Sequence, residues 1–227
     1  MMELRAEKIS RDFLRYSAKD GYFTAVAETD FTLAAGTLTA VTGRSGSGKS
    51  TLLHILGGLM KPVTGRVLLD ETDIYALGEA ERDALRRCHI GIAPQRLMSL
   101  AALTVRENIL LPALLTGQEE PAAVRADVLM ERLGIRKLAS VAPSELSGGE
   151  LRRVTIARAL VMQPGILLAD EPTGDLDEEN TRSVLRLLRE TANAGTAVLL
   201  VTHESEARNY ADICYTMEAG KLEQMTL

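Results

Sequence analysis

Gly43 to Thr51 read Gly-Arg-Ser-Gly-Ser-Gly-Lys-Ser-Thr, and the rest of the chain is interpreted outward from this stretch. An apolar run, Leu38 to Thr42, precedes it as a predicted strand, and Leu52 to Leu56 follow it as a predicted helix. A glycine-rich loop that ends in Lys-Ser between a strand and a helix is typical of a phosphate-binding loop. Its glycines let backbone N–H groups turn towards phosphate oxygens, and the helix N-terminus adds a positive field.

This loop predicts a bound nucleotide and a metal ion. Lys49 would reach the β- and γ-phosphates, and the Ser50 hydroxyl would ligate Mg²⁺. The alternative is a flexible Gly/Ser loop, but the minimal pattern arises by chance in roughly one chain of this length per hundred. The loop alone does not say what the nucleotide is used for. The other residues expected to contact the nucleotide here are Gly43, Arg44, Ser45, Gly46, Ser47, Gly48 and Thr51.

Composition narrows the class of protein. The 227 residues are 46% hydrophobic and 25% charged, which is ordinary for a globular chain of one large domain or two small ones. The net charge of −5 argues against a nucleic-acid surface or an electrostatic membrane anchor. No uncharged apolar run approaches the roughly 20 residues that span a bilayer. We therefore expect a cytoplasmic chain whose membrane role, if any, comes through a partner.

The first part of the chain predicts strands around the loop. Leu4 to Leu14 and Thr24 to Leu33 alternate between apolar and polar residues, and a turn follows at Ala35-Gly36. Together with Leu38 to Thr42 they predict a small, partly antiparallel sheet that leads into the loop. Gly78 to Arg87 is a charged segment that favours a helix, and strands are expected over Arg66 to Leu69 and His89 to Ala93.

The middle of the chain changes character. Thr104 is a plausible helix N-cap with Glu107 in the first turn, and a further helix is expected from Pro121 to Leu133. We find no convincing strand in this block. It therefore reads as a helical subdomain, residues 96–151, inserted into an α/β core made of residues 1–95 and 152–227.

The last third returns to alternating helices and strands, which implies a parallel sheet covered on both faces. Helices are expected over Glu150 to Met162, Glu178 to Asn193 and Ser205 to Tyr210, and strands over Ile166 to Ala169 and Ala197 to Val201, before a final strand or two.

Polar side chains follow several of these strands. Asp170 and Glu171 end one strand, and His203 follows the next. Ligands of open α/β sheets bind at the carboxyl ends of the strands. Asp170 is therefore a candidate Mg²⁺ ligand and Glu171 a candidate for polarising the attacking water, although an acidic helix cap is the plain alternative. His203 is a candidate hydrogen-bond donor to the γ-phosphate.

Two further features extend this site. Gln95 also ends a strand, and its amide oxygen is a possible Mg²⁺ ligand. Ser147-Gly148-Gly149 turns into a helix, which makes a second anion-binding N-terminus in one chain. One triphosphate does not need two such ends from one subunit. Two subunits arranged head to tail would each present this turn to the other's nucleotide.

The order of these motifs, with Leu146 and Glu150 flanking the glycine turn and Gly174 to Asp177 following Glu171, resembles the ATP-binding cassette family over nearly the whole chain. The resemblance implies a P-loop α/β core, an active ATPase with ATP and Mg²⁺, and a homodimer or pseudo-homodimer.

The resemblance also implies residue roles. Tyr16 would stack on adenine, with Tyr22 or Phe23 as less favoured substitutes. Gln95 would sense both Mg²⁺ and a membrane partner, and Asp177 would lie at the dimer interface. Ser147, Gly148 and Gly149 would contact the opposite subunit's γ-phosphate, and the catalytic set would be Glu171 as the catalytic carboxylate, Lys49, and His203 as the switch histidine.

Leu103 to Ile109 and Val201 to Glu204 are similar to the lipoprotein-release and macrolide or antimicrobial-peptide export group. This similarity implies an integral membrane permease as partner and a peripheral place on the inner face of the cell membrane. Pro94 and Leu97-Met98 depart from the family pattern where the permease should dock. A soluble family member, such as an iron–sulfur cluster assembly factor, and a P-loop kinase or GTPase are the alternatives.

Overall fold

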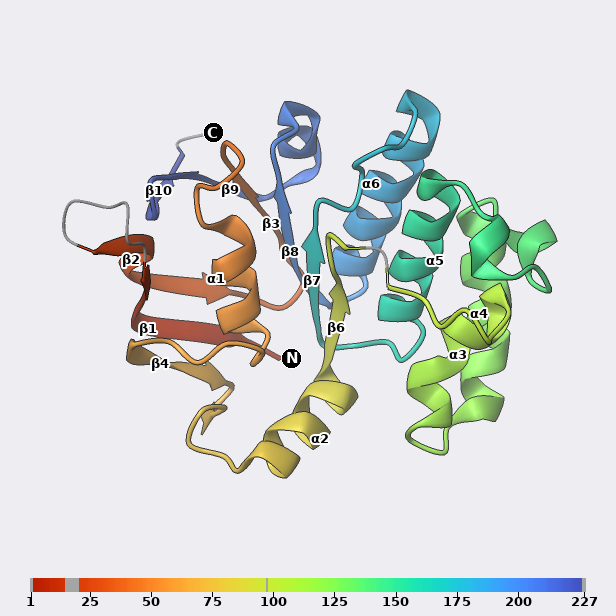
Figure 1. Ribbon diagram of the computed structural model, residues 1–227, viewed down its shortest axis with the longest axis horizontal. Coiled ribbons are helices and arrows are strands. Elements are labelled where there is room, and N and C mark those ends of the chain that lie inside the picture. The colour runs from red at the N-terminus through yellow and green to blue at the C-terminus, as the bar shows by residue number, and fades with distance from the viewer. Residues whose placement is uncertain (1, 15–20, 97, 226–227) are drawn as a thin grey trace.

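The central sheet of the protein carries the strand ends predicted to form the site (Figure 1). The computed structural model describes residues 2–14, 21–96 and 98–225. Within them, six strands follow the order β10-β9-β3-β8-β7-β6. All neighbours in this order run parallel except β10 and β9, so the predicted parallel sheet is confirmed. The strands are β3 (Leu38–Thr42), β6 (Ile90–Ala93), β7 (Ile166–Asp170), β8 (Ala197–Thr202), β9 (Ile213–Glu218) and β10 (Lys221–Gln224).

A second, antiparallel sheet has the order β2-β1-β4-β5. We expected Leu38 to Thr42 to belong to it, and this prediction was wrong. All five residues of β3 are buried, and the strand lies between β8 and β9 in the central sheet. A strand buried on both faces suits the interior of a parallel sheet. The antiparallel strands are β1 (Leu4–Leu14), β2 (Tyr22–Leu33), β4 (Thr64–Leu69) and β5 (Thr72–Asp73).

Helices cover both faces of the central sheet. Helix α1 (Lys49–Leu56) lies between the two sheets, and α5 (Gly148–Leu160) and α6 (Glu178–Asn193) lie on the opposite face (Figure 1). Strand β7 contributes to the core on both faces of the central sheet, because its side chains point alternately to one face and the other. Leu168 packs in the cluster that contains α1, and Leu167 packs in the cluster that contains α5 and α6.

A helical part lies beside α5, away from the antiparallel sheet (Figure 1). Helix α3 (Val105–Leu114) begins at the predicted N-cap, where the Thr104 hydroxyl accepts a hydrogen bond from Glu107 N at 3.3 Å. Helix α4 (Glu119–Arg132) and short 3-10 turns at Arg136–Leu138 and Pro143–Glu145 follow. Helix α5 crosses residue 151 without a break and so joins this part to β7.

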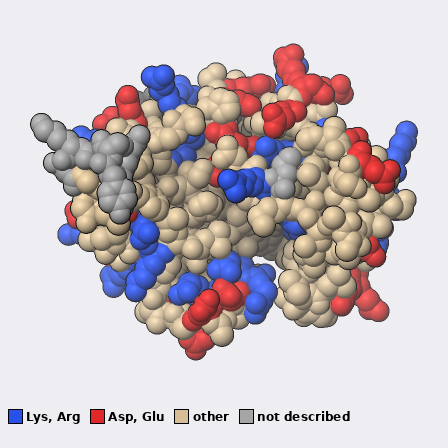
Figure 2. Space-filling view, in the orientation of Figure 1, with Lys and Arg blue, Asp and Glu red and all other residues tan. Residues whose placement is uncertain are grey.

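A groove separates the helical part from helix α2 (Glu79–His89), and Figure 2 shows the surface hollowed there, with both basic and acidic side chains over α2. Arg86 and Arg87 line one wall, and Leu111 and Leu115 line the other. The last helical segment is a 3-10 helix at Ser205–Tyr210. Among the described residues, no helix is long and apolar enough to cross a membrane.

Candidate functional site

The glycine-rich loop runs from β3 into α1 in a conformation that requires glycine at two positions. Gly48 has φ 109°, and a Cβ there would lie 1.9 Å from the carbonyl oxygen of Ala25. A Cβ on Gly43 would lie 2.2 Å from the carbonyl oxygen of Met217. The loop is therefore held closely against β2 and β9, which leaves its other face open.

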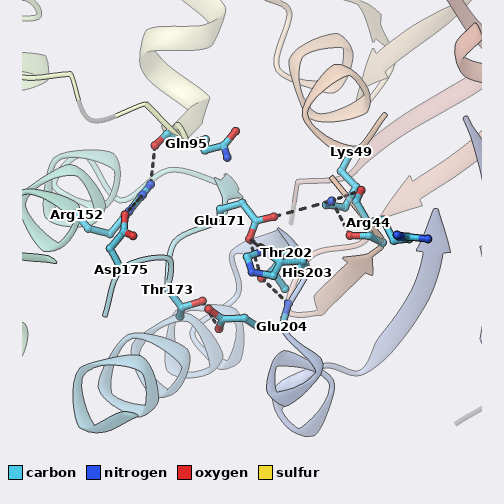
Figure 3. Close-up of polar contacts among 11 residues, drawn as sticks. Arg44, Lys49, Gln95, Arg152, Glu171, Thr173, Asp175, Thr202, His203 and Glu204 are labelled. Carbon is cyan, nitrogen blue, oxygen red and sulfur yellow. Dashed lines mark hydrogen bonds and ion pairs between the residues drawn. The ribbon is translucent and has the colours of Figure 1, made fainter. Parts of the chain in front are cut away.

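Lys49 is the first residue of α1, and its side chain reaches back to the start of the loop (Figure 3). Its Nζ donates to the carbonyl oxygens of Gly43, at 2.8 Å, and Arg44, at 3.1 Å. The same nitrogen lies 3.9 Å from Glu171 Oε1, and the Lys49 side chain is only 6% exposed. A buried ammonium needs such acceptors, and phosphate oxygens are acceptors of the same kind. The position of Lys49 thus suits the predicted contact with phosphates.

Glu171 follows β7 with φ 48°, a conformation that costs a residue with a side chain roughly 1–2 kcal/mol. Its Oε2 accepts hydrogen bonds from Thr202 Oγ1 at 3.0 Å and from His203 N at 3.3 Å, and lies 2.9 Å from His203 Nδ1. The ends of β7 and β8 therefore bring the two predicted residues into direct contact, as Figure 3 shows. Backbone strain of this kind is tolerated where the surrounding structure fixes it, and it often marks a functional site.

Asp170, the last residue of β7, is 2% exposed. Its Oδ1 is buried and has no hydrogen-bond partner among the described residues. Burial raises the pKa of this carboxyl group, whereas a hydrogen bond with Ser50 acts in the opposite direction. A carboxylate oxygen without a hydrogen-bond partner and a neighbouring hydroxyl oxygen are suitable ligands for Mg²⁺, which prefers oxygen.

Lys49, Glu171 and His203 line one cavity of about 350 Å³, and Asp170 lies behind it, next to the lining residue Ser50. The cavity contains most of the predicted loop residues together with Gln95, Glu171 and His203. Its lining residues are Phe13, Phe23, Ala25, Ser45, Gly46, Gly48, Lys49, Ser50, Thr51, Gln95, Glu171 and His203.

The aromatic residues of this cavity differ in part from those expected. Tyr16 lies outside the described residues. Tyr22 is 59% exposed and is not among the lining residues, whereas Phe23 is. Phe13 was not predicted. It is the cross-strand partner of Phe23 in the β1–β2 hairpin, so only the register of that hairpin reveals it.

The Ser147 turn begins α5 as a capping box. Ser147 Oγ accepts from Glu150 N at 3.3 Å, and Glu150 Oε2 accepts from Ser147 N at 2.8 Å. Hydrogen bonds from the Ser147 hydroxyl and backbone lower the pKa of Glu150. Ser147, Gly148 and Gly149 line a second cavity, of about 330 Å³, and none of them is among the described residues that line the cavity of Lys49.

Asp177 lies in this second cavity and caps α6. Its carboxylate accepts from the Asn180 backbone N at 2.8 Å and from Asn180 Nδ2 at 2.7 Å, and these bonds lower its pKa. A Cβ on Gly149 would lie 3.1 Å from Leu176 Cδ2. The start of α5 is therefore packed against the loop that leads to Asp177.

Several known proteins are similar to this chain in sequence. A family model described as ABC transporter matches residues 26–174. The lipoprotein-releasing system ATP-binding protein LolD of Shewanella oneidensis is 40% identical over 224 residues, which cover 97% of this chain and 95% of that protein. The macrolide export ATP-binding/permease protein MacB of Bartonella henselae is 38% identical over 92% of this chain but only 32% of its own length.

Solved structures agree with the fold. The dimeric structure of MJ0796, a bacterial ABC transporter cassette, superposes with a TM-score of 0.89 at 29% identity and covers 99% of both chains. A second structure of that protein, in a post-hydrolysis state bound to ADP and Pi, superposes with a TM-score of 0.88. The predicted P-loop core and the predicted resemblance are thereby confirmed: this chain belongs to the ABC transporter family, as one of its ATP-binding cassettes.

Proposed function

We propose that two copies of this cassette close head to tail around two Mg·ATP, hydrolyse them, and so drive a membrane permease of the lipoprotein-release or export type. One observation carries the two-subunit arrangement. Within one chain, the loop of Lys49 and the turn of Ser147 line separate cavities, although both are built to bind anions. A second copy supplies the missing half of each site.

The Lys49 cavity is proposed to hold both the adenine and the phosphates of ATP. The adenine stacks on Phe13 or Phe23, or on Tyr16 from outside the described residues. Backbone N–H groups of the loop, residues 43–51, hold the phosphates. Lys49 exchanges its two carbonyl acceptors for β- and γ-phosphate oxygens. Because Lys49 is already desolvated, this exchange requires little reorganisation.

Ser50, Asp170 and Gln95 are the proposed Mg²⁺ ligands. The ion would neutralise charge on the β- and γ-phosphate oxygens. The unpartnered Oδ1 of Asp170 and the neighbouring Ser50 hydroxyl are the observations that support this assignment. Gln95 lines the same cavity from the end of β6. Asp170 would hold the ion directly or through a water molecule.

Glu171 and His203 act on the γ-phosphate. The Glu171 carboxylate polarises the attacking water, and His203, whose side chain is 64% exposed, donates a hydrogen bond to the phosphoryl group. Their mutual contact keeps both groups at the carboxyl ends of neighbouring strands. Ser147 to Gly149 of the second copy close the site from the other side, with Asp177 at the same interface.

The groove between α2 and the helical part is the proposed permease contact. Arg86, Arg87 and Arg158 give it a basic rim, and Leu111 and Leu115 give it an apolar wall. Burial lowers the pKa of Arg158, and its Nη2 donates to the carbonyl oxygen of Met98. A short partner segment with both apolar and acidic side chains fits this lining. The contact would hold the cassette on the inner face of the cell membrane.

Co-purification tests this function. The tagged chain is extracted from native membranes in mild detergent, and the integral membrane proteins that remain bound are identified by mass spectrometry. A permease whose presence changes the ATPase rate is the expected result. An Arg87→Glu, Leu115→Glu variant should lose it but keep basal ATP hydrolysis. Recovery of iron–sulfur assembly proteins alone would contradict the proposal, which the similarity to LolD and MacB supports.

A further inference from the structure

Arg152 joins parts of the chain that the proposed function assigns to different nucleotides (Figure 3). It lies near the start of α5, just beyond the Ser147 turn. Its Nη1 donates to the backbone carbonyl oxygen of Gln95 at 2.7 Å. Its Nη2 lies 3.6 Å from Asp175 Oδ2, in the loop that follows Glu171.

The burial of Arg152 is unusual for a charged side chain. Its side chain is 7% exposed, against 76% for Asp175, and its Nε is buried without a partner among the described residues. A buried charge costs several kcal/mol of desolvation, which good pairing offsets only in part. A side chain placed only to stabilise α5 against the core would be better apolar. The planar guanidinium, however, fixes two directions at once, towards Gln95 and towards Asp175.

The backbone beside this contact packs against Arg152 and the first turn of α5. Asp175 has φ 64°, a left-handed conformation that residues with a side chain rarely adopt. A Cβ on Gly174 would lie 3.6 Å from Arg152 Nη2, and a Cβ on Gly149 would lie 3.4 Å from Asp175 O. The loop before Asp177 is thus held between the first turn of α5 and the Arg152 guanidinium. A shift of the Gln95 carbonyl therefore moves the same group that orients this loop.

We propose that Arg152 is a positioning residue that couples the Gln95 segment, at a chain's own nucleotide, to the Ser147 turn and the Asp177 loop, which act on the partner's nucleotide. The inference rests on the proposed two-subunit function. ATP bound in one cavity orders Gln95, the Gln95 carbonyl holds Nη1, and the guanidinium sets the start of α5 and the Asp175 loop for closure. Binding at one site thereby prepares the surface that completes the other.

The test measures binding and closure separately in the full chain. A Glu171→Gln background prevents turnover. The ATP concentration for half-maximal dimer formation is measured by analytical ultracentrifugation, and ATP affinity of the monomer is measured at protein concentrations too low for dimers. Arg152→Met keeps most of the aliphatic part of the side chain and removes the guanidinium group. Arg125→Met is the matched control, because Arg125 Nε donates to the Val161 carbonyl oxygen, at 2.7 Å, at the other end of α5.

Arg152→Met should leave monomer affinity within about twofold and raise the ATP concentration for dimerisation about 5- to 150-fold, the usual range of coupling between sites. Arg125→Met should change neither quantity. If Arg152→Met dimerised at the same ATP concentration as its background, or if Arg125→Met weakened dimerisation equally, this inference would be overturned but the proposed function would stand. Failure of Glu171→Gln itself to dimerise with ATP would overturn the proposed function and the inference with it.

Asp175→Asn provides a second variant whose folding is not in question, because the side chain is exposed. It should weaken dimerisation in the same direction. If the guanidinium acts through Asp175, the double variant Arg152→Met, Asp175→Asn should lose less than the product of the two single losses. Strictly multiplicative losses would show that the two residues act separately, and would contradict the coupling.

Discussion

His203 Nδ1 lies 2.9 Å from Glu171 Oε2 across the ends of two neighbouring parallel strands. An ionised carboxylate only accepts hydrogen bonds, so Nδ1 carries a hydrogen in this contact, and the proposed donation from Nε2 to the phosphoryl group requires a hydrogen on that nitrogen as well. The Thr202 hydroxyl and the His203 backbone N–H bind the same carboxylate oxygen. Oε1 therefore remains for Lys49, 3.9 Å away, and for the water that the proposed mechanism requires.

Glu171→Gln should retain ATP, accumulate a closed dimer and hydrolyse ATP about 10²- to 10⁴-fold more slowly, the range for loss of a general base. The amide keeps the shape of the side chain but is far less basic than the carboxylate. Steady-state phosphate release and size-exclusion chromatography with Mg·ATP measure the two effects. Glu131→Gln, at an exposed position of α4, is the control and should behave as the parent. Parent-like turnover by Glu171→Gln would remove the role assigned to Glu171.

Much of the candidate site could be predicted from sequence because its residues lie at the end of a buried apolar strand or directly after it. Parallel strands bring their carboxyl ends to one edge, so the positions of Asp170, Glu171 and His203 follow from pattern alone. The placement of β3 could not be predicted in this way. Its period does not reveal which strands it pairs with, since pairing depends on distant residues of β8 and β9.

The two capping boxes that begin with a hydroxyl residue, at Thr104 and at Ser147, form a natural matched pair. Ser147 and Thr104 each accept from the N3 backbone N–H at 3.3 Å. Ser147→Ala and Thr104→Ala should therefore cost similar stability, about 1 kcal/mol for loss of an N-cap. Only Ser147→Ala should also weaken ATP-dependent dimerisation, because only Ser147 is proposed to face the partner's nucleotide. Urea unfolding and ultracentrifugation test these statements. Equal effects of both variants on dimerisation would contradict the role of Ser147.

Asp170→Asn should uncouple Mg²⁺ from nucleotide binding. The neutral amide fills the same space as the buried carboxyl group but is a poorer ligand for a hard cation such as Mg²⁺. In the parent, Mg²⁺ should raise the melting temperature of the ATP-bound protein. In Asp170→Asn this increment should disappear, while stabilisation by ATP without the metal remains. Differential scanning fluorimetry with ATP and either Mg²⁺ or a chelator measures it. An undiminished Mg²⁺ increment would exclude Asp170 as a ligand.

The aromatic contact and the Arg152 contacts show where sequence patterns stop being informative. Phe13 reaches the cavity because the β1–β2 register places it opposite Phe23, and this register contains irregular steps. Arg152 looks like an ordinary charged residue of an amphipathic helix. Only its 7% exposure and its bond to the Gln95 carbonyl distinguish it, and both arise from tertiary packing.

Tyr75 links α1 to the residues that follow it. Because of this residue, we expect the free energy of unfolding to depend on pH in the alkaline range. Its hydroxyl lies 2.7 Å from the Ile55 carbonyl oxygen and 2.6 Å from that of Met60, and burial raises its pKa. Tyr75→Phe should lower the free energy of unfolding by about 1 kcal/mol at pH 8, since it removes one donated bond. Urea unfolding measures this loss, and Tyr22→Phe, at an exposed tyrosine, should show little change at that pH.

The sign of the pH effect follows from the raised pKa of Tyr75. A folded-state pKa above the unfolded value, about 10 for tyrosine, means that the hydroxyl contributes its full stability below that pH. Above it, the unfolded chain loses the Tyr75 proton first, so this contribution falls as pH rises towards the folded-state pKa. The difference between the parent and Tyr75→Phe should therefore be constant from pH 7 to 9 and shrink beyond about 10. A difference that stays constant or grows there would show that burial does not keep the Tyr75 hydroxyl protonated in the folded state.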